Sequence, residues 1–139
     1  MKTTMVEPYL FFGGRCEEAL EFYKGAIGAK VLYLIRYKES PEKLPVGMLA
    51  PEYEDKVMHS TISVGGSQFM MSDGCGEKLN FAGFSLSLAV PDKAVAEKVF
   101  AALAVGGAVK MPLTKTFWSP CFGMLTDKFG MGWMISVEA

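Results

Sequence analysis

Few side chains in this sequence could carry chemistry, and they do not form a metal-binding pattern. His59 is the single histidine of the 139 residues, and the cysteines Cys16, Cys75 and Cys121 show no CxxC spacing. Transition-metal sites usually draw on several imidazoles or thiolates, and a disulfide framework needs paired cysteines. The sequence therefore predicts reduced thiols in a cytoplasmic protein, without a zinc site or a disulfide framework.

His59 is the first candidate for a catalytic residue, because an imidazole can take up and release a proton near neutral pH. A structural histidine that hydrogen-bonds to the neighbouring backbone is the alternative. Asp73 could hold a water molecule or a substrate hydroxyl, but Asp73 and Asp127 both lie beside predicted turns, where a turn-stabilising carboxylate is the alternative. Cys121 would be reactive only in an exposed, electropositive setting, and no basic cluster lies near it in the sequence.

The elements that must position these residues follow from hydrophobic periodicity. Apolar runs bounded by turn residues predict strands at Pro8–Phe12, Lys30–Lys38, Val57–Val64, Gln68–Ser72, Phe84–Val90, Ala108–Thr116, Cys121–Thr126 and Trp133–Val137. Helical spacing of apolar residues predicts a helix over Cys16–Ile27 with Gly28 as its C-terminal cap. A second predicted helix follows Asp92 as its N-cap and ends at Gly106-Gly107.

The order of these elements repeats along the chain. Each half has a strand, a helix and three more strands, and Gly28-Ala29 after the first helix matches Gly107-Ala108 after the second. One helix leaves much of a four-stranded sheet uncovered, so two such units are expected to pair. The predicted fold class is α+β, with two βαβββ modules at residues 5–73 and 83–138 that form curled mixed sheets in a single domain spanning residues 1–139.

A long irregular segment, Glu39–Lys56, interrupts the first half. It contains three prolines and a glycine among charged residues. Loops of this length in compact domains are often functional or mobile. A lid over a binding site and a surface insertion without a role are the two interpretations.

Several motifs resemble the vicinal oxygen chelate superfamily, which includes glyoxalase I, bleomycin-resistance proteins and extradiol dioxygenases. Glu18-Ala19-Leu20-Glu21-Phe22-Tyr23 and Ile27-Gly28-Ala29 are similar to the first helix of that superfamily. Other motifs resemble its PhnB-like branch, whose members are sometimes labelled 3-demethylubiquinone-9 3-methyltransferases. They are His59, Gly65-Gly66, Met70-Met71-Ser72-Asp73, Thr116-Phe117-Trp118 and the closing runs Thr126–Gly130 and Trp133-Met134-Ile135. The resemblance implies a glyoxalase/bleomycin resistance-like fold.

The resemblance also implies where a metal would bind. Metal-binding relatives take His, Glu, Gln or Tyr ligands from their first, fourth, fifth and eighth strands. The corresponding residues here are Glu7, Pro8 or Tyr9, then Met70 and Met71, then Phe84 and Ser85, and finally Met134 with Ser136. Hard divalent cations need oxygen or imidazole ligands, and thioethers suit only soft metals. No metal is therefore expected, and neither is glyoxalase- or dioxygenase-type metal chemistry.

No organic cofactor is expected either. A nucleotide-type cofactor usually needs a glycine-rich turn between a strand and a helix. Gly13-Gly14 is the one candidate, and Arg15-Cys16 follow it in place of further glycines. The methyltransferase name of the branch therefore finds no support in these motifs.

In this superfamily each sheet curls around a pocket, so the resemblance implies a ligand site inside that curl. Aromatic and methionine side chains provide a large, adaptable apolar surface for a ligand. The candidates to line it are Tyr9, Phe11, His59, Met71, Phe117, Trp118 and Trp133. For Trp118, core packing is the alternative. Relatives commonly form symmetric homodimers, and exposed strand edges give that expectation a physical basis.

Composition excludes other classes of partner. The chain has 14 Lys and Arg against 15 Asp and Glu, a net charge of −1, which gives no electrostatic reason to bind nucleic acid or an anionic membrane. No apolar run is long enough to span a bilayer, and the first eight residues lack the features of a signal peptide.

Three hypotheses of function follow. The first is a metal-independent protein that binds a small aromatic or amphipathic molecule. The second is an enzyme, a lyase, isomerase or transferase, with an atypical metal site or with acid–base chemistry around His59, Asp73 or Glu7. The third is a dimeric domain whose role is interaction alone.

Overall fold

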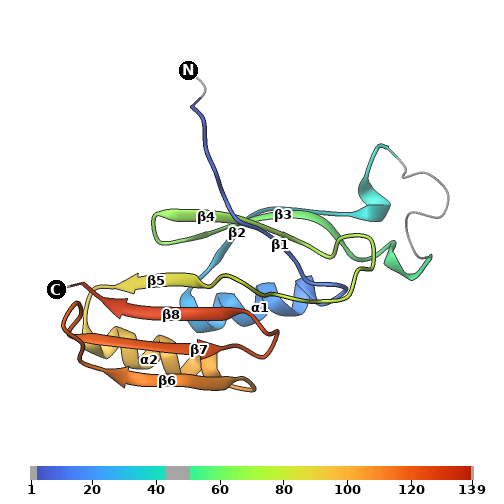
Figure 1. The fold of residues 1–139 in the computed structure, drawn as a ribbon. Coiled ribbons are helices and arrows are strands. Elements are labelled where there is room, and N and C mark those ends of the chain that lie inside the picture. The colour runs from blue at the N-terminus through green and yellow to red at the C-terminus, as the bar shows by residue number, and fades with distance from the viewer. Residues whose placement is uncertain (1–2, 43–50, 139) are drawn as a thin grey trace. The chain divides into compact units, whose positions relative to one another are not determined.

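The computed structural model describes residues 3–42 and 51–138, which form two compact units, Met1–Leu79 and Asn80–Ala139 (Figure 1). The first unit contains β1 (Tyr9–Phe11), α1 (Cys16–Ile27), β2 (Lys30–Arg36), β3 (Val57–Val64) and β4 (Ser67–Ser72). The second contains β5 (Leu86–Val90), α2 (Lys93–Ala104), β6 (Ala108–Thr114), β7 (Cys121–Thr126) and β8 (Gly132–Val137). Neither helix has the length and apolar content needed to cross a membrane.

The two units share one sheet topology, which confirms the predicted α+β class and its two βαβββ modules. The strand order is β1-β4-β3-β2 in the first sheet and β5-β8-β7-β6 in the second. In each sheet the strand before the helix pairs in parallel with the last strand, and the remaining pairs are antiparallel. The prediction that the modules make up a single domain stays a prediction.

Each helix forms where the sequence supplies an apolar face and a cap. The first helix spans the predicted residues, carries Glu17 and Glu18 in its first turn, and ends at Gly28, whose φ of 69° is the left-handed conformation that glycine adopts without strain. The second helix starts after Asp92, whose carboxylate accepts a hydrogen bond of 2.9 Å from the Val95 N–H. The N-cap predicted at Asp92 is therefore confirmed.

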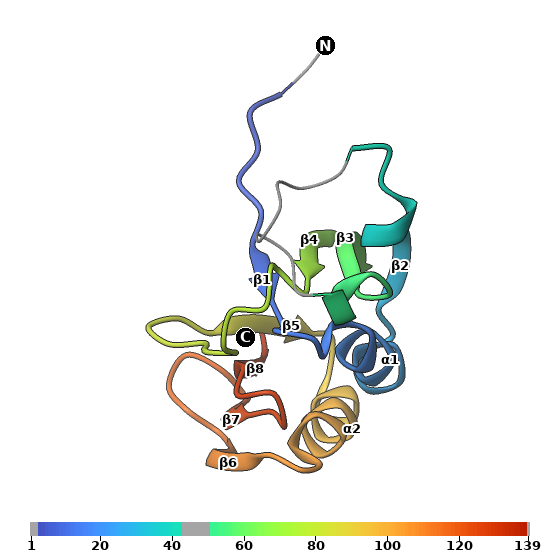
Figure 2. The same ribbon diagram turned by 90° about the vertical axis from the view of Figure 1, so that its right-hand side faces the viewer.

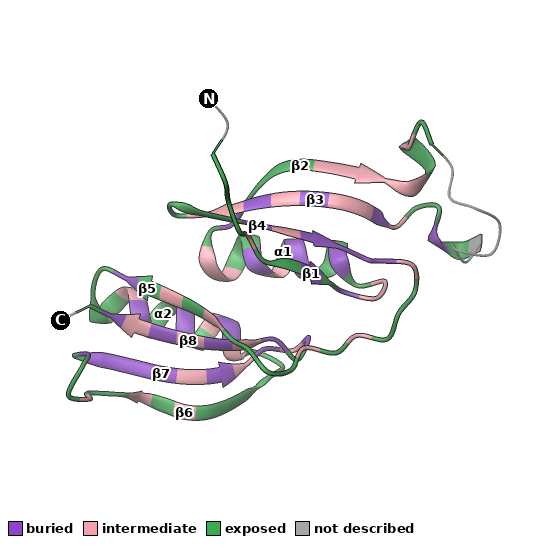
Figure 3. Cartoon of the chain, turned by 45° about the horizontal axis from the view of Figure 1, so that its top comes forward, coloured by how far each residue is buried: buried purple, intermediate pink, exposed green. Residues whose placement is uncertain are grey.

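Strand alternation separates a buried face from an open face in each sheet (Figure 3). In the first unit the buried side chains of the strands include Leu10, Ser60, Ile62, Phe69 and Met71. In the second unit they include Cys121, Leu125, Trp133, Ile135 and Val137. Each set lies on the face toward the helix of its own unit. Figure 2 shows α1 and α2 beside the strands of their own units.

The strands differ from the predicted ones mainly at their ends. Lys30–Lys38 was predicted as one strand, but β2 ends at Arg36 and a 3-10 turn follows over Tyr37–Glu39. That turn forms because the Glu39 carboxylate accepts a hydrogen bond of 2.8 Å from the Arg36 backbone N–H. The strand predicted over Ala108–Thr116 ends at Thr114, because the Thr116 N–H bonds to the Ser119 carbonyl at 2.9 Å and starts a turn.

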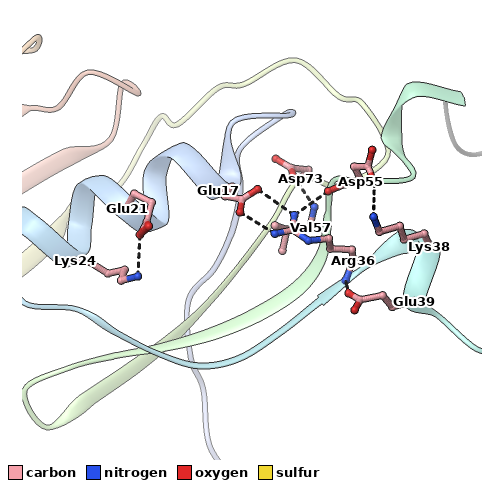
Figure 4. Close-up of polar contacts among 9 residues, drawn as sticks. All are labelled: Glu17, Glu21, Lys24, Arg36, Lys38, Glu39, Asp55, Val57 and Asp73. Carbon is pink, nitrogen blue, oxygen red and sulfur yellow. Dashed lines mark hydrogen bonds and ion pairs between the residues drawn. The ribbon is translucent and has the colours of Figure 1, made fainter.

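Ion pairs close the base of the segment predicted as the long loop, of which residues 43–50 lie outside the described part. The Arg36 guanidinium binds the Glu17 carboxylate at 2.7 Å and the Asp55 carbonyl at 2.9 Å, and Lys38 pairs with Asp55 at 2.7 Å (Figure 4). The hydrogen bond from Arg36 holds the pKa of Glu17 below its usual range. The two ends of the segment are thereby held together and tied to the start of α1.

One buried carboxylate joins three elements of the first unit. Asp73 Oδ1 accepts hydrogen bonds of 2.8 Å from the Gly14 and Cys16 N–H groups. Oδ2 accepts one of 2.9 Å from the Val57 N–H, which Figure 4 shows. The Asp73 N–H in turn donates to the Val57 carbonyl at 2.9 Å. These contacts support a structural role for Asp73, the alternative to holding a water molecule or a substrate hydroxyl.

We expect Asp73→Asn to destabilise the protein by about 3 kcal/mol, because the amide nitrogen must face a buried N–H donor in either orientation of the side chain. The matched control is Asp92→Asn, since asparagine is as good an N-cap as aspartate. The measurement is urea unfolding followed by circular dichroism. Equal stability of the two variants would contradict the role assigned to Asp73.

Candidate functional site

The open face of the first sheet, the face turned away from α1, carries three of the predicted site residues: Tyr9, Phe11 and His59. Cross-strand pairing puts Tyr33, Thr61, Met70 and Tyr9 in one row as successive Cα partners on β2, β3, β4 and β1. His59 lies on the same face two residues before Thr61, and Phe11 lies two residues after Tyr9. These side chains alternate with the buried ones, so they face away from the core.

The rings on this face form an aromatic cluster of Tyr9, Phe11, Tyr33 and His59. The Tyr9 ring centroid lies 5.0 Å from that of Phe11 and 5.6 Å from that of His59, and the Tyr33 centroid lies 6.1 Å from that of His59. Tyr9 is 37% exposed, and Phe11 and Tyr33 are each 52% exposed. Exposed apolar surface concentrated in one place commonly marks a binding site.

Both nitrogens of His59 have hydroxyl neighbours. The Tyr9 hydroxyl lies 3.1 Å from Nδ1, and the Thr61 hydroxyl lies 3.5 Å from Nε2. The hydrogen-bond partners of His59 are therefore side chains of the open face. A purely structural His59 was expected to bond to the neighbouring backbone instead. The two hydroxyls fix the plane of the imidazole, so His59 presents a defined ring edge on the open face.

Met71 and Trp133 were predicted to line the ligand site, and the structure places both in the cores. Met71 is fully buried and pairs with Leu10 and Ser60 on the helix side of the first sheet. Trp133 is 3% exposed, and its indole N–H donates to the Asp127 carboxylate at 2.9 Å. Neither side chain faces its unit's open side, because strand alternation turns it toward the helix.

Phe117 and Trp118, the remaining two candidates, lie in the second unit at a turn between β6 and β7. Phe117 is 96% exposed, and its ring centroid lies 4.8 Å from that of Trp118. The Trp118 ring also contacts Phe122, with a centroid distance of 5.3 Å. Their described ring contacts are thus with each other and with Phe122, all within the second unit.

The residues at the superfamily's metal positions do not fit a hard divalent cation. The fourth-strand residue that faces outward is Met70, whose thioether is a soft ligand, while Met71 is turned into the core. In the second unit the corresponding outward residue of β8 is Met134, paired with Met124. Among the described residues no three His, Cys, Asp or Glu side chains are grouped as a metal site would require.

The glycine turn before α1 is engaged within the chain. Gly13 and Gly14 have φ values of 59° and 105°, and this turn aims the amides of Gly14 and Cys16 at one point. The Asp73 carboxylate occupies that point with two hydrogen bonds of 2.8 Å. Backbone amides at a helix N-terminus can bind a cofactor phosphate, but here the amides of Gly14 and Cys16 bind the Asp73 carboxylate of the same chain.

Sequence reasoning missed Tyr33 and Lys30, which lie on the open face of β2. The register between β2 and β3 decides their face: Tyr33 pairs with Thr61 and Lys30 with Ser63, so both lie on the same face as His59. A bulge between Val31 and Tyr33 shifts the alternation of β2, and nothing in its continuous apolar run reveals it.

Comparisons with known proteins agree with this architecture. Residues 4–136 match the family model described as 3-demethylubiquinone-9 3-methyltransferase, and the chain belongs to that family. It is a PhnB-like member of the glyoxalase/bleomycin resistance/dioxygenase superfamily, as the resemblance in its motifs predicted.

Three relatives are similar along nearly the whole chain. Protein YjdN of Escherichia coli K12 is 36% identical, over 95% of this chain and 94% of its own. The crystal structure of protein PA1353 from Pseudomonas aeruginosa is 40% identical, with a TM-score of 0.83 and 98% of both chains covered. A putative 3-demethylubiquinone-9 3-methyltransferase, PhnB protein, from Bacillus cereus is 30% identical, with a TM-score of 0.78 and coverage of 96% and 99%.

A more distant structure shows the fold alone. A glyoxylase/bleomycin resistance protein/dioxygenase domain from Frankia is 13% identical, with a TM-score of 0.71 over the full length of both chains. The glyoxalase-like fold is therefore confirmed, and the chemistry must be argued from the side chains of this chain.

The cysteines differ sharply in accessibility. Cys16 and Cys121 are buried, and Cys75 is partly exposed. Burial, and then the charge of Asp73, raises the pKa of the Cys16 thiol far above its usual range, so this thiol forms little reactive thiolate.

We expect iodoacetamide to modify Cys75 first in the native protein, with Cys16 and Cys121 protected until the protein unfolds. Intact-mass and peptide mass spectrometry over a time course measures the order, and Cys75→Ser is the control that should remove the fast adduct. Rapid labelling of Cys16 in the folded protein would contradict the packing described for α1.

Proposed function

We propose that this protein binds a small aromatic or amphipathic molecule on the open face of its first sheet, without a metal ion. The observation that carries the proposal is the aromatic cluster, in which Tyr9 and Tyr33 both contact the His59 ring and Phe11 contacts Tyr9. Aromatic faces offer stacking partners, and the hydroxyl and imidazole groups offer hydrogen bonds that fix the orientation of a ligand.

The cluster is prearranged by the backbone that carries it. The short strand β1 is held in place by its ladder to β4 and by two further hydrogen bonds, from the Met70 N–H to the Pro8 carbonyl at 2.9 Å and from the Phe12 N–H to the Ser72 carbonyl at 2.8 Å. Tyr9 and Phe11 are therefore fixed relative to β4. A ligand that binds a preformed surface loses less free energy to ordering the protein.

The side chains also favour binding without a cofactor. Met70 stands where a metalloenzyme of the superfamily needs an oxygen or imidazole ligand, and the Gly13-Gly14 turn is engaged by Asp73. The family name refers to a methyltransferase, and neither feature offers a site for a nucleotide-type methyl donor.

An enzyme that uses His59 for proton transfer is the second hypothesis. The close approach of the Tyr9 hydroxyl to Nδ1 is the observation that favours it, because a tyrosine–histidine pair can relay a proton. The hydroxyls beside both nitrogens favour a positioning role for His59 instead, since a general base needs one nitrogen directed at the substrate.

A homodimeric interaction domain is the third hypothesis, and the edge strand β2 supports it. Val31, Leu32 and Tyr33 are exposed in succession, and the outer edge of β2 has no partner strand in the described sheet (Figure 3). Such an edge can pair with a second copy of the chain. We therefore propose a homodimer that pairs through β2, in addition to the ligand-binding face.

We expect 2-naphthamide, a neutral amphipathic probe, to bind the open face and to lose affinity when the cluster is truncated. Phe11→Ala and Tyr33→Ala should each weaken binding about two- to tenfold, the range of one aromatic contact. The measurement is a ¹H–¹⁵N NMR titration of the full chain, followed at the amides of β1, β2 and β3.

Phe84→Ala is the matched control, because Phe84 is 48% exposed against 52% for Phe11 but precedes β5 in the second unit. Affinity should be unchanged in this variant. Equal losses in the three variants, or shifts spread over the whole chain, would show nonspecific adsorption and contradict the proposed site.

We expect the protein to retain no stoichiometric metal after loading with Mn, Ni, Co and Zn in turn and desalting, because thioethers replace the hard ligands. Plasma mass spectrometry of the untagged protein gives the metal content per chain. Retention of one metal per chain that is lost in Glu7→Gln or His59→Ala would overturn the metal-free proposal.

A further inference from the structure

A polar row runs beside the aromatic row on the open face of the first sheet. The aromatic row is Tyr33, Thr61, Met70 and Tyr9. The polar row consists of the successive Cα partners Lys30, Ser63 and Gln68 on β2, β3 and β4. Ser63 lies two residues from Thr61, so the rows are about 7 Å apart along the strands.

The charges of this surface are asymmetric. Lys30 is exposed and forms no ion pair with any residue in the described part of the chain, and on β2, β3 and β4 neither row contains a carboxylate. The nearest acidic residue along β1 is Glu7, two residues before Tyr9. It lies at the opposite edge of the sheet, three strand spacings from β2, which is about 14 Å.

We propose that the open face binds aromatic carboxylates, with the ring on the aromatic row beside Tyr33 and the carboxylate directed at Lys30. This inference rests on the proposed function and adds the chemical class and orientation of the ligand. The Lys30 ammonium supplies the charge, and the hydroxyls of Ser63 and Thr61 supply hydrogen-bond donors between the two groups. On β2, β3 and β4 neither row contains a carboxylate, so a cationic ligand beside Tyr33 would lack a partner there.

Three probes of the same size test the inference: 2-naphthoate, 2-naphthamide and 2-naphthylmethylamine, which are anionic, neutral and cationic. Dissociation constants are measured by NMR titration of the full chain at low and at moderate salt. The expected order is naphthoate tightest and the amine weakest, with the advantage of naphthoate over naphthamide decreasing as salt is added.

Lys30→Met should weaken naphthoate about fivefold, the upper range of an exposed ion pair, and leave naphthamide unchanged. Lys30→Arg should restore the preference for naphthoate, which separates a charge effect from a packing effect. Glu7→Gln is the control for general electrostatics and should leave the order of the three probes as it is. Thermal unfolding of each variant verifies that the fold is retained.

The outcomes distinguish this inference from the proposed function. If naphthamide and naphthoate bind equally at the aromatic cluster, or if Lys30→Met leaves their ratio unchanged, the assignment of carboxylates is wrong and the binding face stands. A tighter amine would likewise overturn the assignment, through attraction of the cation to the tyrosine rings. If none of the probes perturbs β1, β2 or β3, the proposed function itself fails.

Discussion

The carboxylate of Asp73 ties the turn before α1, the start of β3 and the end of β4 to one buried point. Removing such a carboxylate leaves several backbone N–H groups unsatisfied at once, which costs more than losing a single exposed contact. The strand β1 contains three residues and leads directly into that turn. The directions of Tyr9 and Phe11, and with them the aromatic cluster, therefore depend on this one anion.

The second unit uses the same physical solution at another place. The Asp127 carboxylate accepts hydrogen bonds from the Phe129 and Met131 N–H groups at 2.9 and 3.1 Å and from the Trp133 indole at 2.9 Å. It closes the β7–β8 turn, whereas Asp73 joins elements distant in sequence. The two aspartates thus fix the backbone of both units, while the outward side chains differ: Tyr9, Tyr33 and His59 on the first sheet, and Phe122, Met124 and Met134 on the second.

Periodicity predicted the elements well because α1, β3 and β7 each combine a regular apolar pattern with a clear glycine, proline or aspartate boundary. It did not predict which of two adjacent methionines faces outward. Phe69-Met70-Met71 is apolar without alternation, and only the pairing of Met71 with Leu10 decides its face. Trp133 was misplaced for a related reason: the turn at Asp127 was predicted, but the spacing does not show that the Trp133 indole faces the core and donates to the Asp127 carboxylate.

The outward-facing side chains of the strands, and not the fold itself, determine what this protein can bind. The same βαβββ scaffold can present carboxylates and imidazoles to a metal or rings and thioethers to an apolar ligand, because strand alternation leaves these positions free of core packing. Here Met70 lies between Tyr9 and Thr61, so the centre of the face is apolar while its edges carry His59 and Lys30. A surface with an apolar centre and polar edges gains most from a ligand that is itself amphipathic, since each part of the ligand then meets its own kind of partner.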